Sequence, residues 1–251
     1  MRRGCNVRSL RRIGIALLCL AWFPVVAADC SGTIYLTIDT GSMSHAEFIA
    51  RTLKEENVKA TFFLANERTV RKDYSLDPSW DAYWKALADD GHAFGNHTWS
   101  HRWARRDAAE KVMVADSKGN ADALDQKAFC EEMRRVNAAF KRATGRDLAG
   151  IWRAPGGRTT QNSLRFAASC GYPIHVHWDD TGFLGDELPS EQYPNSVLLE
   201  RALKNVKAGD ILVMHTGIWS RKDPFAPMLK PLIQGLKSKG FCFATIEAGR
   251  R

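Results

Sequence analysis

Two histidines four residues apart, His97 and His101, stand in the stretch Gly95-Asn96-His97-Thr98-Trp99-Ser100-His101. Residues at this spacing share one face of a helical turn, so both imidazoles can reach one metal ion. Imidazole nitrogen binds Zn²⁺ at about 2.0–2.1 Å, and the ion takes three or four such ligands. The chain holds seven His, so a pair also arises by chance. The pattern gains weight only from reactive residues elsewhere.

Polar and titratable residues follow several short apolar runs of the sequence. They are Asp39-Thr40-Gly41, Arg153-Ala154-Pro155-Gly156-Gly157, Trp178-Asp179-Asp180 and His215-Thr216-Gly217. Each has an ordinary explanation: Asp39 as a turn acid, His215 as a core histidine, Arg153 as an ion-pair partner of Asp179. In a parallel barrel, however, chemistry collects at the carboxyl ends of the strands. Their coincidence with the histidine pair predicts one site at that rim.

The elements that position these residues alternate between strand and helix. We expect strands at 33–39, 60–64, 92–96, 150–153, 173–178, 210–215 and 242–246, and helices at 45–56, 78–90, 126–144, 161–170, 195–206 and 225–239. The strand runs are almost entirely apolar, as in a sheet covered on both faces. Alternation with this many units predicts an α/β fold with a parallel barrel.

One segment interrupts the alternation. Residues 103–124 are polar and charged, and we expect a loop or short excursion over the barrel mouth. The helix that follows places apolar residues at a spacing of three and four: Phe129, Met133, Val136 and Phe140. We interpret this stripe as core packing.

The first 28 residues are predicted to be a secretory signal peptide. Five Arg precede an apolar run from Ile13 to Val26, and small residues, Val26-Ala27-Ala28, offer a cleavage site. The run is shorter than the ~20 apolar residues that span a membrane, although a retained anchor is the alternative. After cleavage we expect no stable membrane insertion and an exported, periplasmic or extracellular bacterial protein.

The remaining chain, residues 29–251, has the length of one domain with a full core. The leader accounts for five of the formal net charge of +8, which leaves +3. This modest charge demands no nucleic-acid partner.

Four cysteines remain after the leader: Cys30, Cys130, Cys170 and Cys242. An even number in an exported protein favours disulfides, and three pairings are available. Cys30 precedes the first strand and Cys242 lies in the last, which are neighbours in a closed barrel. We therefore favour Cys30–Cys242 with Cys130–Cys170, the alternative being four buried thiols.

The order of these motifs resembles the polysaccharide deacetylases with a NodB-type domain, carbohydrate esterase family 4. The motifs are Thr37-Ile38-Asp39-Thr40-Gly41, His97-Thr98-x-x-His101, Arg153-x-Pro155, Asp179-Asp180-Thr181-Gly182 and Leu212-Val213-Met214-His215. The resemblance spans the chain from Ile34 to Ile246. It implies a distorted (β/α)₇ barrel, a divalent metal, and hydrolysis of an acetyl group on a sugar.

The resemblance also assigns roles. His97 and His101 would hold the metal, most simply Zn²⁺, with Co²⁺ or Ni²⁺ as alternatives, and the metal would acidify a water. Asp39 would be the general base and His215 the general acid. Arg153 would orient Asp39, with Asp179 or Asp180 fixing Arg153. The loop Pro155-Gly156 would supply an oxyanion N–H, and Val213 would line the pocket of the acetyl methyl.

Three departures from the family pattern alter these expectations. The family has a metal-binding acid where this chain has Thr40, and a hydroxyl is a poor ligand beside a carboxylate. Either the metal would then be held by the two histidines with Thr40, waters or Asp39, or metal binding would be weak. The aromatic that follows the proline of the third motif is replaced by Gly156, and the fourth motif lacks its Asp-Trp pair. Trp99 and Trp103 could supply the missing stacking surface for a sugar, or pack in the core.

The sequence thus predicts an exported, metal-dependent carbohydrate deacetylase that acts on an acetylated glycan such as peptidoglycan, a chitin-type oligomer or an exopolysaccharide. Two other functions stay open. One is a barrel hydrolase of a non-sugar amide or cyclic imide, which the altered groove would allow. The other is a catalytically silent glycan-binding barrel, which Thr40 favours and the retained Asp39 and His215 oppose.

Overall fold

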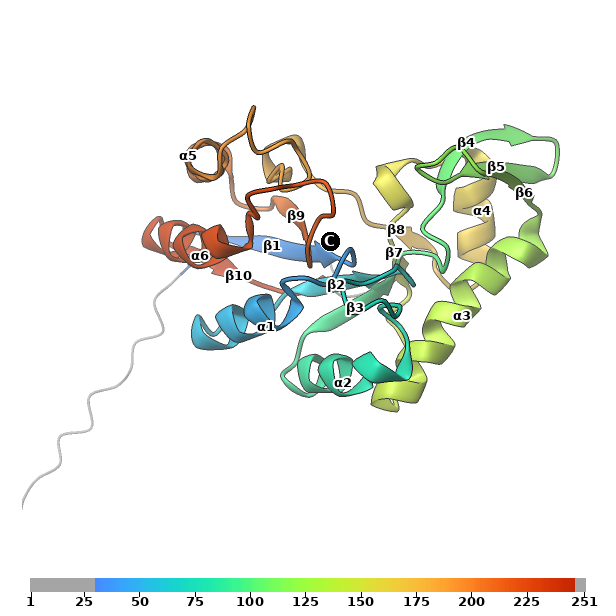
Figure 1. Ribbon diagram of the computed structural model, residues 1–251, viewed down its shortest axis with the longest axis horizontal. Helices are drawn as coiled ribbons and strands as arrows, with labels where there is room; N and C mark the ends of the chain where they lie inside the picture. Colours follow the sequence, from blue (N-terminus) through green and yellow to red (C-terminus); the bar gives the residue numbers. More distant parts are fainter. Residues whose placement is uncertain (1–29, 247–251) are drawn as a thin grey trace, which may run out of the picture.

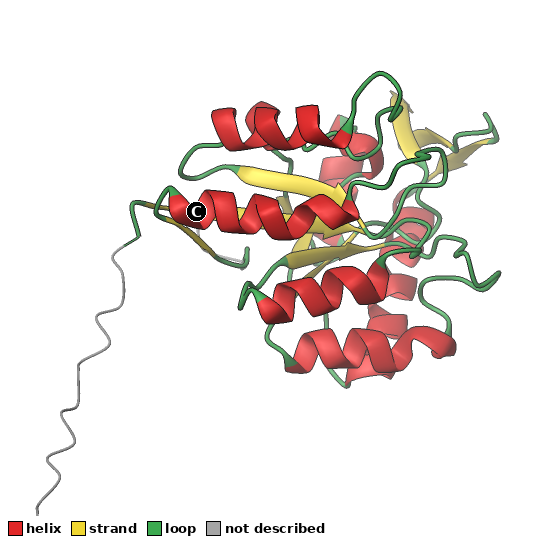
Figure 2. Ribbon diagram, turned by 60° about the vertical axis from the view of Figure 1, so that its left-hand side comes forward, coloured by secondary structure: helices red, strands yellow, loops and turns green. Residues whose placement is uncertain are grey.

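The structure, a computed structural model, describes residues 30–246 (Figure 1). The leader predicted at residues 1–28 lies outside this range. Parallel strands form the centre and helices surround them (Figure 2). The helices are α1 (Ala46–Glu55), α2 (Asp81–Asp89), α3 (Gln126–Thr144), α4 (Gln161–Ser169), α5 (Asn195–Asn205) and α6 (Leu229–Ser238). Among the described residues, no helix is both long and apolar enough to cross a membrane.

The central sheet is built around β1 (Gly32–Asp39). β1 pairs in parallel with β2 (Thr61–Leu64), with β9 (Ile211–His215) and, through its first residues, with β10 (Phe241–Phe243). From β2 the sheet continues to β3 (Ala93–Asn96), β7 (Ile151–Trp152) and β8 (Ile174–His175).

The sheet curls, because a parallel bridge between Phe183 and Val213 brings the chain that follows β8 against β9. Seven described strands therefore form a parallel, curled sheet with helices outside. The predicted distorted (β/α)₇ barrel is confirmed, and each expected strand and helix is present with ends shifted by a few residues.

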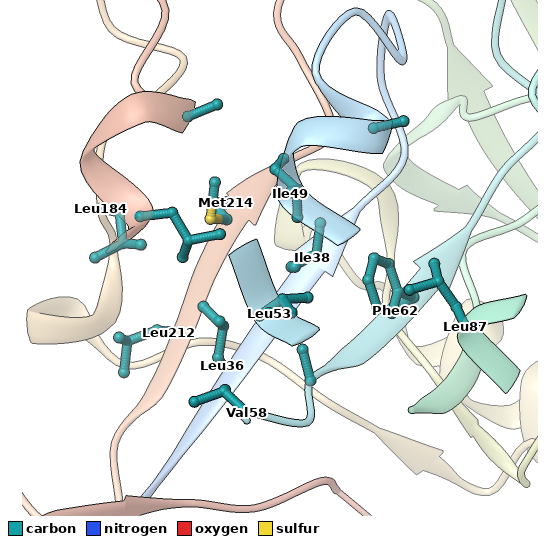
Figure 3. Close-up of a cluster of buried hydrophobic side chains, with 14 of the residues drawn as sticks. Leu36, Ile38, Ile49, Leu53, Val58, Phe62, Leu87, Leu184, Leu212 and Met214 are labelled. Carbon is teal, nitrogen blue, oxygen red and sulfur yellow. The ribbon is translucent and has the colours of Figure 1, made fainter. Parts of the chain in front are cut away.

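The two faces of β1 explain how the fold presents its polar residues. Leu36 and Ile38 point toward α1, where they pack with Ile49 and Leu53 in the main core (Figure 3). Successive side chains of a strand alternate between faces, so Asp39 lies on the opposite face, inside the curled sheet, where it is only 2% exposed.

Helix α3 has the bounds expected from its sequence. The Asp125 side chain accepts a hydrogen bond from the N–H of Ala128 at its start, and Gly145 in the left-handed conformation ends it. Its predicted apolar stripe, from Phe129 to Phe140, is buried.

The expectation of a loop at residues 103–124 is wrong. This segment forms an antiparallel sheet of β4 (Trp103–Ala108), β5 (Lys111–Ala115) and β6 (Ala121–Leu124), which lies beside α3 and α4 (Figure 1). Val112 and Val114 are two residues apart, lie on the same face of β5, and pack against Phe129 and Phe166. Only one face of this small sheet is covered, so β4 and β6 can carry charged residues. These residues obscure the short apolar pattern in the sequence.

The preferred disulfide pairing is confirmed. Cys30 bonds to Cys242, with 5.6 Å between their Cα atoms, and joins the start of β1 to β10. Cys130 bonds to Cys170, with 5.3 Å between Cα atoms, and joins α3 to the end of α4.

Candidate active site

The strand ends converge on one cavity of about 300 Å³. Eight residues singled out in the sequence line it: Asp39, His97, His101, Trp103, Gly156, Trp178, Val213 and His215. Cavities of this size hold small ligands. The prediction that these strand ends share one rim is confirmed by their common cavity.

Asp39 is fixed by its neighbours in the sheet and by Arg153. It lies opposite His215 in the register of β1 and β9, and its Oδ1 accepts a hydrogen bond from Nη1 of Arg153 at 2.7 Å. Burial alone would raise the pKa of Asp39, but Arg153, with His97 and His215, holds it below its ordinary value. Asp39 is therefore an ionised carboxylate at neutral pH.

Arg153 is completely buried and finds its partners without Asp180. Besides Asp39, its Nε donates to the carbonyl of Val176 at 3.1 Å, and its guanidinium lies 4.3 Å from the centroid of the Phe63 ring. The structure thus supports Arg153 as the residue that orients Asp39.

The expectation that Asp179 or Asp180 fixes Arg153 is wrong. Asp179 instead accepts a hydrogen bond from the backbone N–H of Ile211 at 2.7 Å. Asp180 is exposed at the start of the short 3₁₀ helix η3 (Asp180–Gly182). A backbone oxygen and an aromatic face surround part of the guanidinium, while its Nη2 is buried without a hydrogen-bond partner among the described residues.

His97 is oriented for ligation. Its Nδ1 lies 2.8 Å from the carbonyl of Arg153, which leaves Nε2 facing the cavity at 3.5 Å from Oδ2 of Asp39. Burial lowers the pKa of His97 to about 4, so the imidazole is neutral at pH 7. Metal-binding histidines commonly bond backbone carbonyl with the other ring nitrogen in this way.

The two histidines approach through a loop, not through the helical turn expected from their spacing. Thr98 and His101 adopt left-handed backbone conformations with φ of 60° and 51°, which are strained for residues with a side chain. Glu132 holds the loop by accepting from both N–H and Oγ of Ser100 at 2.7 Å. The ring centroids of His97 and His101 are consequently 4.9 Å apart.

His215 has a carboxylate partner that the sequence reasoning missed. Asp186 accepts from the backbone N–H of His215 at 2.7 Å and lies 3.1 Å from its Nδ1. Burial lowers the pKa of His215, but Asp186 outweighs it and, with Asp39 and Glu187, raises that pKa to about 10. His215 is an imidazolium at neutral pH. The only signal in the sequence was an acid after Leu184-Gly185 in an otherwise irregular segment.

The Thr40 hydroxyl, which was considered as a metal ligand, already has a hydrogen-bond partner. Thr40 is buried, and its hydroxyl accepts a hydrogen bond from the N–H of Ala65 at 3.0 Å. A different carboxylate, Glu67, reaches the histidines: its Oε1 lies 3.5 Å from Nδ1 of His101. Sequence reasoning missed Glu67, because nothing in its neighbourhood marks it as a site residue.

The donor chemistry fits a divalent metal of the zinc type. The neutral Nε2 of His97, the ring of His101 and nearby carboxylates form the nitrogen and oxygen set that Zn²⁺ accepts. Within residues 30–246, no three His, Cys, Asp or Glu side chains already stand as a closed ligand cluster. The residues that would hold an ion are therefore present but not drawn together.

The glycine loop and the apolar wall complete the cavity. Pro155 is buried in the short 3₁₀ helix η2 (Pro155–Gly157), and Gly156 lines the cavity with φ of 61°. Val213, 2% exposed, forms part of the wall. These positions agree with the expected roles, which stay predictions.

The two tryptophans considered as sugar platforms separate. Trp103 lines the cavity, with the guanidinium groups of Arg105 and Arg158 at 5.1 and 5.6 Å from its ring centroid. Trp99 packs against the main core, and Arg135 lies 4.1 Å from its ring. The expectation that Trp99 binds substrate is corrected, because its ring is held by the core.

Comparisons with known proteins identify similar chains. The polysaccharide deacetylase family profile matches residues 27–175. A peptidoglycan-N-acetylglucosamine deacetylase of Bacillus cereus is 26% identical over 218 residues, which cover 85% of this chain and 86% of that protein.

Solved structures share the fold. A peptidoglycan N-acetylglucosamine deacetylase superposes with a TM-score of 0.65 at 23% identity, over 87% of this chain and 90% of the other. A pseudoenzyme of carbohydrate esterase family 4 from Bacillus anthracis superposes with a TM-score of 0.63 at 20% identity, over 86% of this chain and 64% of the other.

Proposed function

Because the chain belongs to the polysaccharide deacetylase family, we propose that this carbohydrate deacetylase is an exported, metal-dependent hydrolase of N-acetylated amino sugars. The name of its Bacillus cereus relative favours peptidoglycan as the glycan. A chitin-type oligomer or an exopolysaccharide carries the same acetamido group and is the alternative substrate.

The observation that carries the proposal is the pair Asp39 and His215. They lie opposite each other on neighbouring strands and both line the cavity. Their environments drive their pKa values apart, below the ordinary value for Asp39 and to about 10 for His215. A carboxylate and an imidazolium at one cavity are the general base and general acid that amide hydrolysis needs.

The first step assigned to this pair is attack of water on the acetyl carbonyl. Asp39 takes one proton from the water while the water oxygen bonds to the carbonyl carbon. Arg153 keeps Oδ1 of Asp39 in place through the 2.7 Å hydrogen bond, so Oδ2 is the oxygen that faces the cavity histidine and accepts the proton.

The second step breaks the carbon–nitrogen bond. His215 donates its proton to the amine nitrogen as acetate forms, and Asp186 stabilises the imidazolium before that transfer. The backbone N–H of Gly156 would face the oxyanion, and Val213 would contact the acetyl methyl. The products are acetate and a free amino sugar.

The proposed cofactor is a divalent metal, Zn²⁺ by preference, with Co²⁺ or Ni²⁺ as alternatives. His97 and His101 would hold it. When bound, such an ion polarises the carbonyl and lowers the pKa of water, which offsets the weak basicity of a carboxylate whose pKa is depressed.

Export is supported by the two disulfides, since such bonds persist in oxidising compartments. Removal of a signal peptide at residues 1–28 is part of this proposal, as is the absence of stable membrane insertion afterwards. The proposed partner is an acetylated glycan, and the charge of the chain without its leader gives no reason to expect nucleic acid.

One observation favours a second candidate, a catalytically silent glycan-binding barrel. Position 40 carries a threonine and therefore offers a metal ion no carboxylate. The Thr40 hydroxyl already accepts a hydrogen bond from a backbone N–H. Against this candidate stands the paired His215–Asp186 arrangement, because binding alone requires no general acid. A barrel that hydrolyses a non-sugar amide would use the same pair.

The test is acetate release from N-acetylated oligosaccharides and peptidoglycan fragments by purified protein, stripped with a chelator and reconstituted with Zn²⁺ or Co²⁺. We expect metal-dependent acetate that Asp39→Asn and His215→Ala each abolish. Glycan binding without acetate, unchanged by His215→Ala, would support the silent barrel. Bound metal without acetate or glycan binding would favour a different amide substrate.

A further inference from the structure

Glu67 has a carboxylate oxygen in an unusual environment. Its Oε2 is buried from solvent and has no hydrogen-bond partner among the described residues. Burying a polar atom without a hydrogen bond is unfavourable, and natural structures rarely keep such an atom without a functional reason. Its other oxygen, Oε1, lies 3.5 Å from Nδ1 of His101. The orphaned oxygen therefore belongs to a side chain already beside one histidine of the cavity.

The backbone around Glu67 is held on both sides. Its N–H donates to Oγ of Ser75 at 3.0 Å, and its carbonyl accepts from the N–H of Ser75 at 2.8 Å. Ser75 is itself anchored, since its hydroxyl donates to the carbonyl of Ala65 at 2.6 Å. The backbone position from which the Glu67 side chain extends is consequently set by the fold.

The loop that carries Glu67 is also tied to the histidine loop. The N–H of Asn66 donates to the carbonyl of Trp99 at 3.0 Å, and the N–H of His97 donates to the carbonyl of Leu64 at 2.9 Å. These two bonds flank the approach of Glu67 to His101. They hold the backbone that carries Glu67 beside the loop that carries the two histidines.

The same strand end that brings Glu67 to the site also forms a hydrogen bond with the side chain of Thr40. The hydroxyl of Thr40 accepts the N–H of Ala65, two residues before Glu67. The chain after β2 thus gives the Thr40 hydroxyl a hydrogen-bond partner. It also supplies a second oxygen donor, the carboxylate of Glu67, which carries more negative charge than a hydroxyl. A carboxylate is the better ligand for a zinc-type ion.

We propose that Glu67 is the carboxylate ligand that completes the divalent-metal site of His97 and His101 in this chain, in the role that an acid at position 40 would otherwise fill. This inference rests on the metal dependence in the proposed function. Glu67 binds the ion, and Thr40 supports the strand end that presents Glu67.

The test measures Zn²⁺ affinity of the chelator-stripped protein by calorimetry, for the wild type and for Glu67→Gln. Gln keeps the size and shape of the side chain beside His101, but its amide is a poor metal ligand. Removing a partner that only orients a ligand costs about 10–100-fold in affinity. We expect Glu67→Gln to lose more than about 100-fold, and a loss of about 100-fold or less, the range of a partner that only orients a ligand, would overturn the assignment.

Glu187→Gln is the matched control. Glu187 lines the same cavity, and its Oε2 lies 3.9 Å from Nε2 of His215, so the variant removes the same charge away from the histidine pair. We expect its Zn²⁺ affinity to stay within a few-fold of the wild type. An equal loss in both variants would mean that only the charge of the cavity matters, and would contradict a ligand role for Glu67.

Two further readouts separate ligation from misfolding. At saturating Co²⁺, the visible absorption of the bound ion should change in Glu67→Gln and stay unchanged in Glu187→Gln. Without metal, Glu67→Gln should unfold near the wild-type Tm, because Gln keeps the size of a side chain that is partly exposed, and it should lose most of the rise in Tm that Zn²⁺ gives the wild type. An unchanged Co²⁺ spectrum would refute the assignment.

Failure of this inference differs from failure of the proposed function. Wild-type protein that binds no Zn²⁺ or Co²⁺ would overturn metal dependence and the role of Glu67 together. Tight metal binding shared equally by the wild type and Glu67→Gln would overturn Glu67 alone and leave the deacetylase in place.

Discussion

Asp186 contacts His215 at two points, since its carboxylate accepts the backbone N–H of His215 at 2.7 Å and lies 3.1 Å from Nδ1 of the ring. One carboxylate therefore sets both the position of the strand end and the charge of the imidazole. This double contact keeps Nε2 of His215 on the cavity side, where a leaving amine would take its proton.

Asp186→Asn should move the alkaline limb of the activity profile to lower pH. Asp186 is the main cause that raises the pKa of His215 to about 10, and its loss should lower that pKa by about 1–3 units. The imidazolium would then be lost closer to neutral pH. The pH dependence of kcat measures the shift. Glu187→Gln, whose side chain is half exposed, should shift the limb much less, and equal shifts would contradict the assignment.

Stability gives the same pair a second, independent readout. Because the pKa of His215 is raised on folding from 6.5 to about 10, the contribution of the pair is complete below pH 6.5 and is lost as pH rises through 10. The difference in Tm between wild type and Asp186→Asn should therefore be large near pH 6 and shrink toward pH 10. A difference that grows with pH would exclude this linkage.

Arg153→Met should both inactivate and destabilise the protein. Arg153 and Asp39 are 0% and 3% exposed, and removing one partner of a buried pair costs about 3–5 kcal/mol. Loss of the orienting bond should lower kcat about 10²-fold. The pKa of Asp39 should rise, because burial then acts unopposed by the guanidinium. Urea unfolding and the acid limb of the kcat profile measure these effects.

The double variant Asp39→Asn/Arg153→Met is the control for that prediction. It removes the orphaned buried charge, so its free energy of unfolding at pH 7 should exceed that of Arg153→Met although its activity is no higher. The single variant should also recover stability as the pH falls through the raised pKa of Asp39, since protonation then neutralises the carboxylate. A double variant no more stable than the single one would show that lost packing, not charge, is responsible.

Trp103→Ala should weaken substrate binding, whereas Trp99→Ala should lower the stability of the fold. Trp103 lines the cavity, so its loss should raise KM for an oligosaccharide by about tenfold with little change in Tm. Trp99 packs on the core, so its loss should cost about 2 kcal/mol of unfolding free energy with KM preserved. Steady-state kinetics and urea titration distinguish them. An increase in KM for Trp99→Ala alone would reverse the assignment.

Local signals predicted the framework well. The bounds of α3 follow from a cap at Asp125, an apolar stripe and a terminal Gly145, all of which are readable within the segment itself. The strands that end in Asp39 and His215 were visible as apolar runs for the same reason. The small β4–β6 sheet was missed, because its pairing depends on strands that are mostly polar and on contact with α3 and α4.

The two missed carboxylates show where single-sequence reasoning stops. Glu67 and Asp186 sit in irregular segments, and each reaches its histidine, His101 or His215, only through tertiary approach. Asp179 or Asp180 was expected to fix Arg153 because both belong to the fourth motif, yet both are exposed. Membership of that motif was a weaker guide than the end of a neighbouring strand.

Gly157→Ala should destabilise the site more than a matched glycine variant elsewhere. Gly157 and Gly145 both have positive φ, 68° and 75°, so Ala at either position pays a left-handed strain of about 1–2 kcal/mol. A Cβ at Gly145 meets open space, whereas one at Gly157 would lie 2.5 Å from Cε1 of His177, and relieving that overlap should cost about 1–3 kcal/mol more. Urea titration of both variants gives the difference directly. The overlap also pushes on the loop of Gly156, so kcat should fall in Gly157→Ala and hold in Gly145→Ala; equal losses of stability and activity would mean that the close contact with His177 is absorbed by movement of the ring.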